Sequence, residues 1–104
     1  MLKHIVMWKL KEEGHHEEGK SKKESNALLA KEYLESLANT IPEIRKIEVG
    51  ININPSEAAF DLVLYSEFDD EKGLECYQNH PDHLRVGEFI RKITETRVVV
   101  DYKA

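Results

Sequence analysis

Cysteines and glycine-rich segments are scarce in this sequence, and their scarcity removes several classes of protein. The 104 residues include one cysteine, Cys76, so no disulfide can form within the chain. A lone thiol fits a reducing compartment and is more typical of a small helix residue than of a nucleophile. No glycine-rich phosphate loop, Gly-x-Ser-x-Gly elbow or Cys-x-x-Cys pair is present, and we expect no cofactor.

Long hydrophobic runs are also lacking. No apolar run approaches the ~20 residues that a membrane-spanning helix needs. The apolar stretch at the start is interrupted by Lys9 and Lys11, which leaves no hydrophobic segment of a signal peptide. The pattern predicts a cytoplasmic protein that does not interact with membranes.

Positive charge is in the minority, because 15 lysines and arginines face 20 acidic residues and the net charge is -5. No basic stripe is present that could neutralise phosphates, so we expect no nucleic-acid partner. Hydrophobic residues make up 40% of the chain, which is well above a disordered composition. The length predicts a single domain spanning residues 1–104.

Apolar residues recur with strand and helix periods along most of the chain. One helix is expected from Ser21, which begins a capping box, to just before Pro42. A second begins at Asp69 and is broken near His80, because the ring of Pro81 clashes with the preceding helical turn. The expected strands are 2–10, 44–53, 59–68 and 97–102. The order is β-α-β-β-α-β, with the two middle strands paired as a hairpin in an α+β fold.

Two helices can cover only one face of a four-stranded sheet. Alternation predicts a helix-facing set of Val6, Trp8, Leu10, Ile47, Val49, Ile51, Leu62, Leu64, Val98 and Val100. The opposite face is expected to hold Ile5, Met7, Ala59, Val63, Tyr65 and Val99, mixed with Glu48, Asn52 and Asp61. Such an uncovered apolar patch predicts a homodimer packed sheet to sheet about a twofold axis. The alternative is a monomer with one solvated sheet face, which antiparallel sheets tolerate.

Three residues that could carry chemistry are expected to converge. His4 lies on the first strand, on the predicted helix-facing side, and Tyr77 and His83 flank the break at Pro81. A neutral imidazole can accept a proton near pH 7, and a phenol can donate to a developing oxyanion. Spacing alone is more typical of structural roles, with His4 hydrogen-bonded in the core, His80 at a helix N-terminus and Tyr77 packed in the core.

Two groups of residues contain potential metal ligands. His80, His83 and Asp82 could bind zinc, but a His-x-x-His pair without a clear third ligand is weak evidence, and we expect no metal. His15 and His16 lie among glutamates and could hold a divalent cation. A solvated charged loop is the favoured interpretation of that segment.

Several motifs, taken in order, resemble one family. They are Lys3-His4-Ile5-Val6, Ile41-Pro42-Glu43-Ile44, Asp61-Leu62-Val63-Leu64 with Ser66-Glu67-Phe68, Tyr77-Gln78-Asn79-His80-Pro81-Asp82-His83, and Val100-Asp101-Tyr102. This pattern is similar to the stress-responsive dimeric A/B-barrel family and runs from Met1 to Tyr102. The resemblance implies a ferredoxin-like monomer with a four-stranded antiparallel sheet, and a dimeric α+β barrel.

The resemblance also implies roles for the site. One plant member of the family, olivetolic acid cyclase, closes a polyketide by aldol condensation. By that likeness His83 is the base, Tyr77 orients the substrate carbonyl and His4 assists positioning. We expect the surrounding pocket to include Val6, Trp8, His80 and Phe89. Trp8 is a departure, because an indole is far bulkier than leucine and fills space that an alkyl tail would need.

Three functions are therefore in competition. The first is a stress-responsive barrel protein that binds a small organic molecule between sheet and helices, and its enzymatic version is a lyase or cyclase acting on a carbonyl or polyketide-like substrate. The second is a non-catalytic structural dimer. The third, oxidation of haem or quinols as in related dimeric α+β barrels, rests on fold analogy alone.

Overall fold

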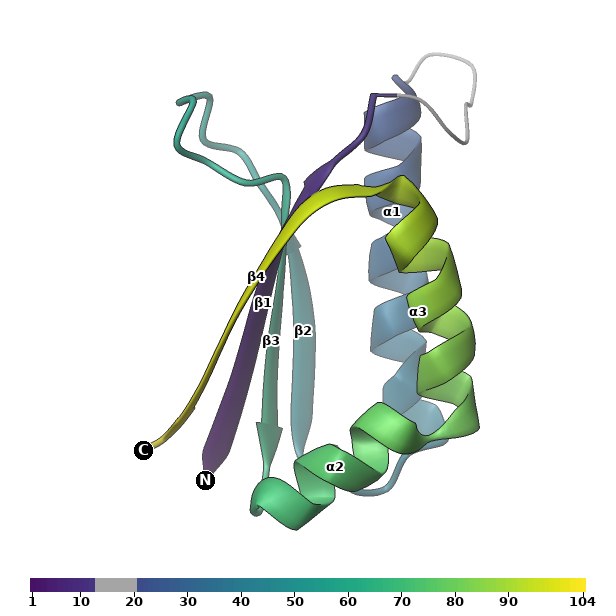
Figure 1. Cartoon of the computed structure of the whole chain (residues 1–104), viewed down its shortest axis with the longest axis vertical. Helices are drawn as coiled ribbons and strands as arrows, with labels where there is room; N and C mark the ends of the chain where they lie inside the picture. Colours follow the sequence, from purple (N-terminus) through teal and green to yellow (C-terminus); the bar gives the residue numbers. More distant parts are fainter. Residues whose placement is uncertain (13–20) are drawn as a thin grey trace.

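The computed structural model describes residues 1–12 and 21–104, which form one sheet covered on one face by helices (Figure 1). The sheet contains β1 (Leu2–Leu10), β2 (Lys46–Ile51), β3 (Leu62–Phe68) and β4 (Thr94–Lys103). The helices are α1 (Lys22–Ser36), a short 3-10 turn η1 (Leu37–Asn39), α2 (Glu71–Asn79) and α3 (Pro81–Ile93). The strand order is β2-β3-β1-β4, and every neighbouring pair is antiparallel. This confirms the predicted β-α-β-β-α-β order and the β2–β3 hairpin.

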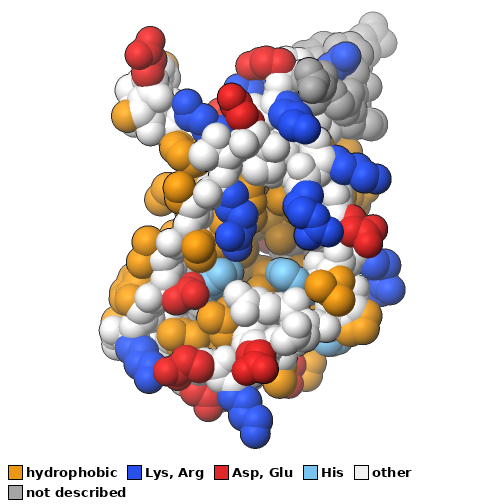
Figure 2. Space-filling model, viewed as in Figure 1, with side chains coloured by type: hydrophobic (Ala, Val, Ile, Leu, Met, Phe, Trp, Pro, Cys, Tyr) orange, Lys and Arg blue, Asp and Glu red, His pale blue; other side chains and the backbone are white. Residues whose placement is uncertain are grey.

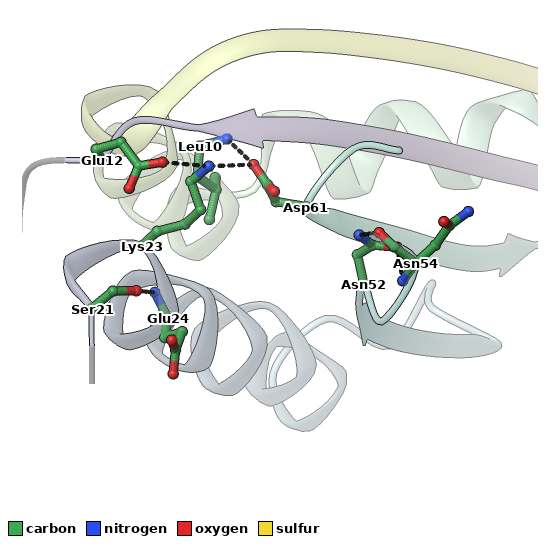
Figure 3. Close-up of polar contacts among 8 residues, drawn as sticks. All are labelled: Leu10, Glu12, Ser21, Lys23, Glu24, Asn52, Asn54 and Asp61. Atoms are coloured by element: carbon green, nitrogen blue, oxygen red, sulfur yellow. Dashed lines mark hydrogen bonds and ion pairs between the residues drawn. The ribbon is translucent and has the colours of Figure 1, made fainter. Parts of the chain in front are cut away.

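The helix boundaries follow from local side-chain chemistry. The hydroxyl of Ser21 accepts the backbone N–H of Glu24 at 3.0 Å, which caps α1 (Figure 3). His80 has extended backbone angles and ends α2, and its Nδ1 accepts the backbone N–H of Asp82 at 3.1 Å. Pro81 is then the first residue of α3, where its missing N–H costs nothing. The predicted break is confirmed.

The loop between β2 and β3 is longer than alternation predicts. The side chain of Asn52 accepts the backbone N–H of Asn54, and the side chain of Asn54 accepts that of Ser56, each at 3.0 Å. Figure 3 shows the turn that Asn52 and Asn54 make. Such local bonds compete with the sheet ladder and shorten both strands. Ala59, which was expected on the open face of the sheet, lies in this loop instead.

The prediction for β4 was wrong about which face its valines occupy. Val99 pairs with Val6 and therefore lies on the helix side, whereas Val98 and Val100 lie on the opposite side. Three consecutive valines carry no alternation signal, so nothing in their own sequence distinguishes the two faces. The pairing with β1 also shifts register around Glu95, at the start of β4. Because of this shift, the face of a β4 residue does not follow from its distance to the end of α3. The correction exchanges the two faces of the whole strand.

The apolar face that no helix covers, here called the open face, is larger than predicted. The strand register places these apolar residues on it: Ile5, Met7, Val63, Tyr65, Val98, Val100 and Tyr102. Met7, Val98, Val100 and Tyr102 are each more than 40% exposed. Lys3 and Lys46 lie over the ring of Tyr65, so cationic side chains border the patch.

The opposite face forms the core. Its buried side chains come from all the helices, from β1, β2 and β3, and from the segment before β2: Leu2, Val6, Trp8, Leu10, Ala27, Ala30, Leu34, Leu37, Ile41, Val49, Leu62, Leu64, Phe68, Leu74, Tyr77, Ile90 and Ile93. Within residues 1–12 and 21–104, no helix is both long enough and apolar enough to cross a membrane.

The outer edge of β2 is closed by α1. The carboxylate of Glu35 accepts the backbone N–H of Val49 at 3.0 Å, and the ammonium of Lys31 donates to the carbonyl of Val49 at 2.6 Å. Lys31 and Glu35 also pair with each other at 2.8 Å. The two backbone groups that an added strand would use at the middle of β2 are therefore already satisfied.

Candidate functional site

A cleft of about 610 Å³ opens between the helix-facing side of β1 and β4 and the inner side of α3. This volume lies in the range of small-molecule sites. Its wall is mainly apolar, formed by Val6, Trp8, Leu34, Leu64, Val86 and Ile90. Figure 2 shows the hollow from its open side, with histidine side chains in it and cationic side chains beside it. The cleft runs along β4, the edge strand on this side of the sheet.

His4 is buried in the cleft and paired with Asp101, its cross-strand neighbour on β4. The distance between His4 Nδ1 and the Asp101 carboxylate is 2.5 Å. A carboxylate is an acceptor, so this contact holds a proton on Nδ1, and Nε2 is the acceptor in that tautomer. Asp101 was not among the predicted site residues, although it lies in the Val100-Asp101-Tyr102 motif.

Tyr77 and His83 lie together at the same end of the cleft. Their ring centroids are 4.4 Å apart, and the Tyr77 ring lies 6.3 Å from that of His4. The Tyr77 hydroxyl and Nδ1 of His83 are buried and have no hydrogen-bond partner in the part of the chain that the structure describes. Buried polar atoms are normally paired, so two orphans beside a cleft indicate a place where a ligand group or water binds.

Burial sets the protonation of both groups. It raises the pKa of the Tyr77 hydroxyl well above its usual range, with Arg97 acting weakly in the opposite direction. Burial also lowers the pKa of His83. The backbone of Gln78 opposes that shift, whereas the positive charge of Arg97 contributes to it. At neutral pH the pair therefore consists of a protonated phenol and a neutral imidazole.

The lowered pKa of His83 predicts a pH dependence of stability. The unfolded chain binds the proton more readily than the folded one, so the free energy of unfolding falls as pH drops below the unfolded value of about 6.5. We expect His83→Gln to reduce this fall, measured by urea unfolding at pH 7.5 and pH 5.5. The control His80→Asn keeps an oxygen that can cap α3 and should retain the wild-type fall. An unchanged pH dependence in His83→Gln would contradict the prediction.

The other predicted pocket residues are divided between the cleft and its surroundings. Val6 and Trp8 line the cleft, and the Trp8 indole forms part of the wall while the volume beside it stays open. His80 caps α3 and is not part of the lining. Phe89 packs against Tyr33 of α1, with ring centroids 5.3 Å apart, and also lies outside the lining.

Sequence reasoning missed the charged residues that β4 and α3 bring to the cleft. Arg97 lies opposite Trp8 in the sheet and lines the cleft together with Arg91 and Glu95. The available signal was the alternation of side chains along the strand. Val98, Val100 and Tyr102 share one face of β4, so Arg97 and Asp101 must lie on the opposite face.

Metal binding finds little support in the described residues. Within them, no three side chains of histidine, cysteine, aspartate or glutamate are arranged to hold a metal ion. His15 and His16 lie outside the described residues. Cys76 lies on α2 as an exposed free thiol.

The fold and the cleft place this chain among ferredoxin-like α+β proteins, and comparison with solved structures agrees. A dimeric protein of unknown function with a ferredoxin-like fold from Bacteroides fragilis is 40% identical, with a TM-score of 0.85, over 99% of this chain and 95% of that one. A dimeric ferredoxin-like protein from Thermobifida fusca is 21% identical, with a TM-score of 0.81, over 99% and 90%. Hydroxynitrile lyase from Passiflora edulis is 19% identical, with a TM-score of 0.79, over 97% and 90%.

The family assignment is more specific than the fold. The family model of the stress responsive A/B barrel domain matches residues 2–104. The chain therefore belongs to the stress responsive A/B barrel domain family, as its motifs indicate. No curated protein matches it.

Proposed function

We propose that the cleft binds a small organic molecule with a carbonyl group and carries out acid–base chemistry of the lyase or cyclase type on it. The observation that carries the proposal is the pair of orphan polar atoms, the Tyr77 hydroxyl and His83 Nδ1, beside an open cleft. A ligand that hydrogen-bonds to both would remove the cost of leaving them buried and unpaired. A purely structural core gains nothing from this arrangement.

The roles follow from protonation state and position. His83 is neutral at pH 7 because burial lowers its pKa, so it can accept a proton from a carbon or hydroxyl next to the carbonyl. Tyr77 keeps its proton and donates a hydrogen bond to the carbonyl oxygen, where negative charge develops. His4 positions the ligand through Nε2, and Asp101 fixes the tautomer that leaves this nitrogen free to accept.

A ligand screen tests the proposal. We expect small carbonyl compounds to raise the melting temperature of the wild-type protein saturably, by mass action on the folded state. The shift should disappear in His83→Gln and persist in His80→Asn, whose side chain lies outside the cleft. Ligands that stabilise all three proteins equally would favour the non-catalytic structural dimer over a binding site at His83.

We also propose that two copies pack through the open face, closing a barrel between their sheets. Seven apolar side chains lie on that face, where no helix of the described chain covers them, and four of the seven are more than 40% exposed. The relative that is 40% identical is described as dimeric. A twofold axis satisfies both patches at once, because each copy supplies the surface that the other lacks.

Two further expectations stand beside this proposal. The Passiflora hydroxynitrile lyase shares the fold, which shows only that the architecture can host a lyase in another protein. A cytoplasmic location stays a prediction, supported by the free thiol of Cys76.

A further inference from the structure

The cleft has two chemically different ends. Trp8 lies four residues after His4 on β1, which corresponds to roughly 13 Å at 3.3 Å per residue. Asp101 lies opposite His4, and Arg97 lies opposite Trp8. The acid–base groups therefore gather at one end, and Arg97 leaves the strand at the other.

The backbone of α3 has a similar spacing. His83 and Arg91 on α3 both line the cleft, and Arg91 lies eight residues after His83, which corresponds to roughly 12 Å of helix. Nη1 of Arg91 lies 3.4 Å from the position that a Cβ of Gly87 would occupy. The guanidinium therefore folds back by about one turn along α3, over a residue that also lines the cleft.

These two arginines differ from the other two in the chain. Arg45 is paired with Asp69 at 2.8 Å, and Arg85 is paired with Asp82. Within residues 1–12 and 21–104, the guanidinium groups of the cleft arginines, Arg91 and Arg97, take part in no ion pair or side-chain hydrogen bond. The chain thus leaves two permanently charged groups without a carboxylate where a ligand would bind.

We propose that the ligand is a small organic acid whose carboxylate binds between Arg91 and Arg97 while its carbonyl or hydroxyl group faces Tyr77 and His83. This inference rests on the proposed function and adds the substrate class. Guanidinium groups bind carboxylates with paired, charge-assisted hydrogen bonds, and the apolar wall between the two ends suits a hydrocarbon body.

A nearby acidic group favours a monoanion. Glu95 also lines the cleft and forms no ion pair with either arginine. A phosphate dianion bound between the arginines would bring two negative charges close to Glu95, whereas a carboxylate brings one. Phosphate is therefore the competing anion that the test must include.

The test uses 4-acetylbenzoate, which has a carboxylate and a ketone at opposite ends of a ring, and its neutral analogue 4-acetylbenzamide. By calorimetric titration of the wild-type protein we expect the acid to bind about tenfold tighter or better than the amide, and its binding to weaken with salt. Arg97→Met should remove this preference. Glu95→Gln should increase the preference, because it removes a repulsive charge.

The possible results distinguish failure of the organic-acid inference from failure of the proposed function. Equal binding of acid and amide, both lost in His83→Gln, would overturn the organic-acid inference and leave the proposed function standing. Tighter binding of inorganic phosphate than of the acid, dependent on Arg97, would also overturn the inference. Absence of His83-dependent binding of either compound would overturn both proposals.

Discussion

Replacing Tyr77 with phenylalanine should stabilise the ligand-free protein. The ring of Tyr77 is fully buried against Phe68, with centroids 5.0 Å apart, and phenylalanine keeps that contact. The hydroxyl is buried without a partner in the described chain, and such a group costs about 1–3 kcal/mol. For a domain of this size, a gain of 1 kcal/mol raises the melting temperature by about 4–8 °C. Calorimetry at fixed protein concentration would measure the shift.

The same substitution should abolish ligand-induced stabilisation, because it removes the donor to the carbonyl oxygen. Opposite effects on stability and binding are typical of a residue kept for function at a cost to the fold. Tyr33→Phe is the matched control, since the Tyr33 ring lies on α1, is 39% exposed and lies outside the cleft. It should change neither quantity. A lower melting temperature in Tyr77→Phe would mean that the hydroxyl is satisfied and that the proposed donor is structural.

Val100→Asp should convert a dimer into a monomer. Val100 is 61% exposed on the open face of β4, at the patch that we propose to be the interface. A twofold axis introduces the carboxylate twice, and each buried unpaired charge costs several kcal/mol. Sedimentation should then show a particle of 12.1 kDa in place of one twice as heavy.

Leu28→Asp provides the matched control for the interface. Leu28 is 44% exposed on α1, so the substitution adds the same charge to a surface on the helical side of the molecule. It should leave the mass unchanged. A wild-type protein that sediments at 12.1 kDa at high micromolar concentration would contradict the dimer, and so would a Val100→Asp variant that keeps twice that mass.

Strong local signals explain why most of the fold could be predicted. The strict alternation from Leu2 to Leu10 gave the correct bounds of β1. Ser21 and Pro81 mark helix starts through a side-chain cap and a fixed backbone angle, and both act within a few residues. Signals of this kind do not depend on distant parts of the chain.

The face of β4 could not be predicted from the same reasoning. Val98, Val99 and Val100 are chemically identical, so their orientation is decided by pairing with β1 and by the irregular start of the strand. The error moved Arg97 and Asp101 away from the site. His4, Tyr77 and His83, which family motifs indicated, do come together in the cleft, whereas their assigned roles stay predictions.

The hydrogen bonds that Lys31 and Glu35 make to the backbone of Val49 limit how this protein can associate with itself. Strand addition requires a free edge on each partner, and the middle of β2 has none to offer. In the part of the sheet that the structure describes, β4 is the other edge strand and can accept a neighbour. Edge pairing through β4 alone ends when two copies meet, whereas a fibre needs two available edges on every molecule. The ion pair of Lys31 and Glu35 on α1 thus protects a sheet with an exposed apolar face from open-ended polymerisation.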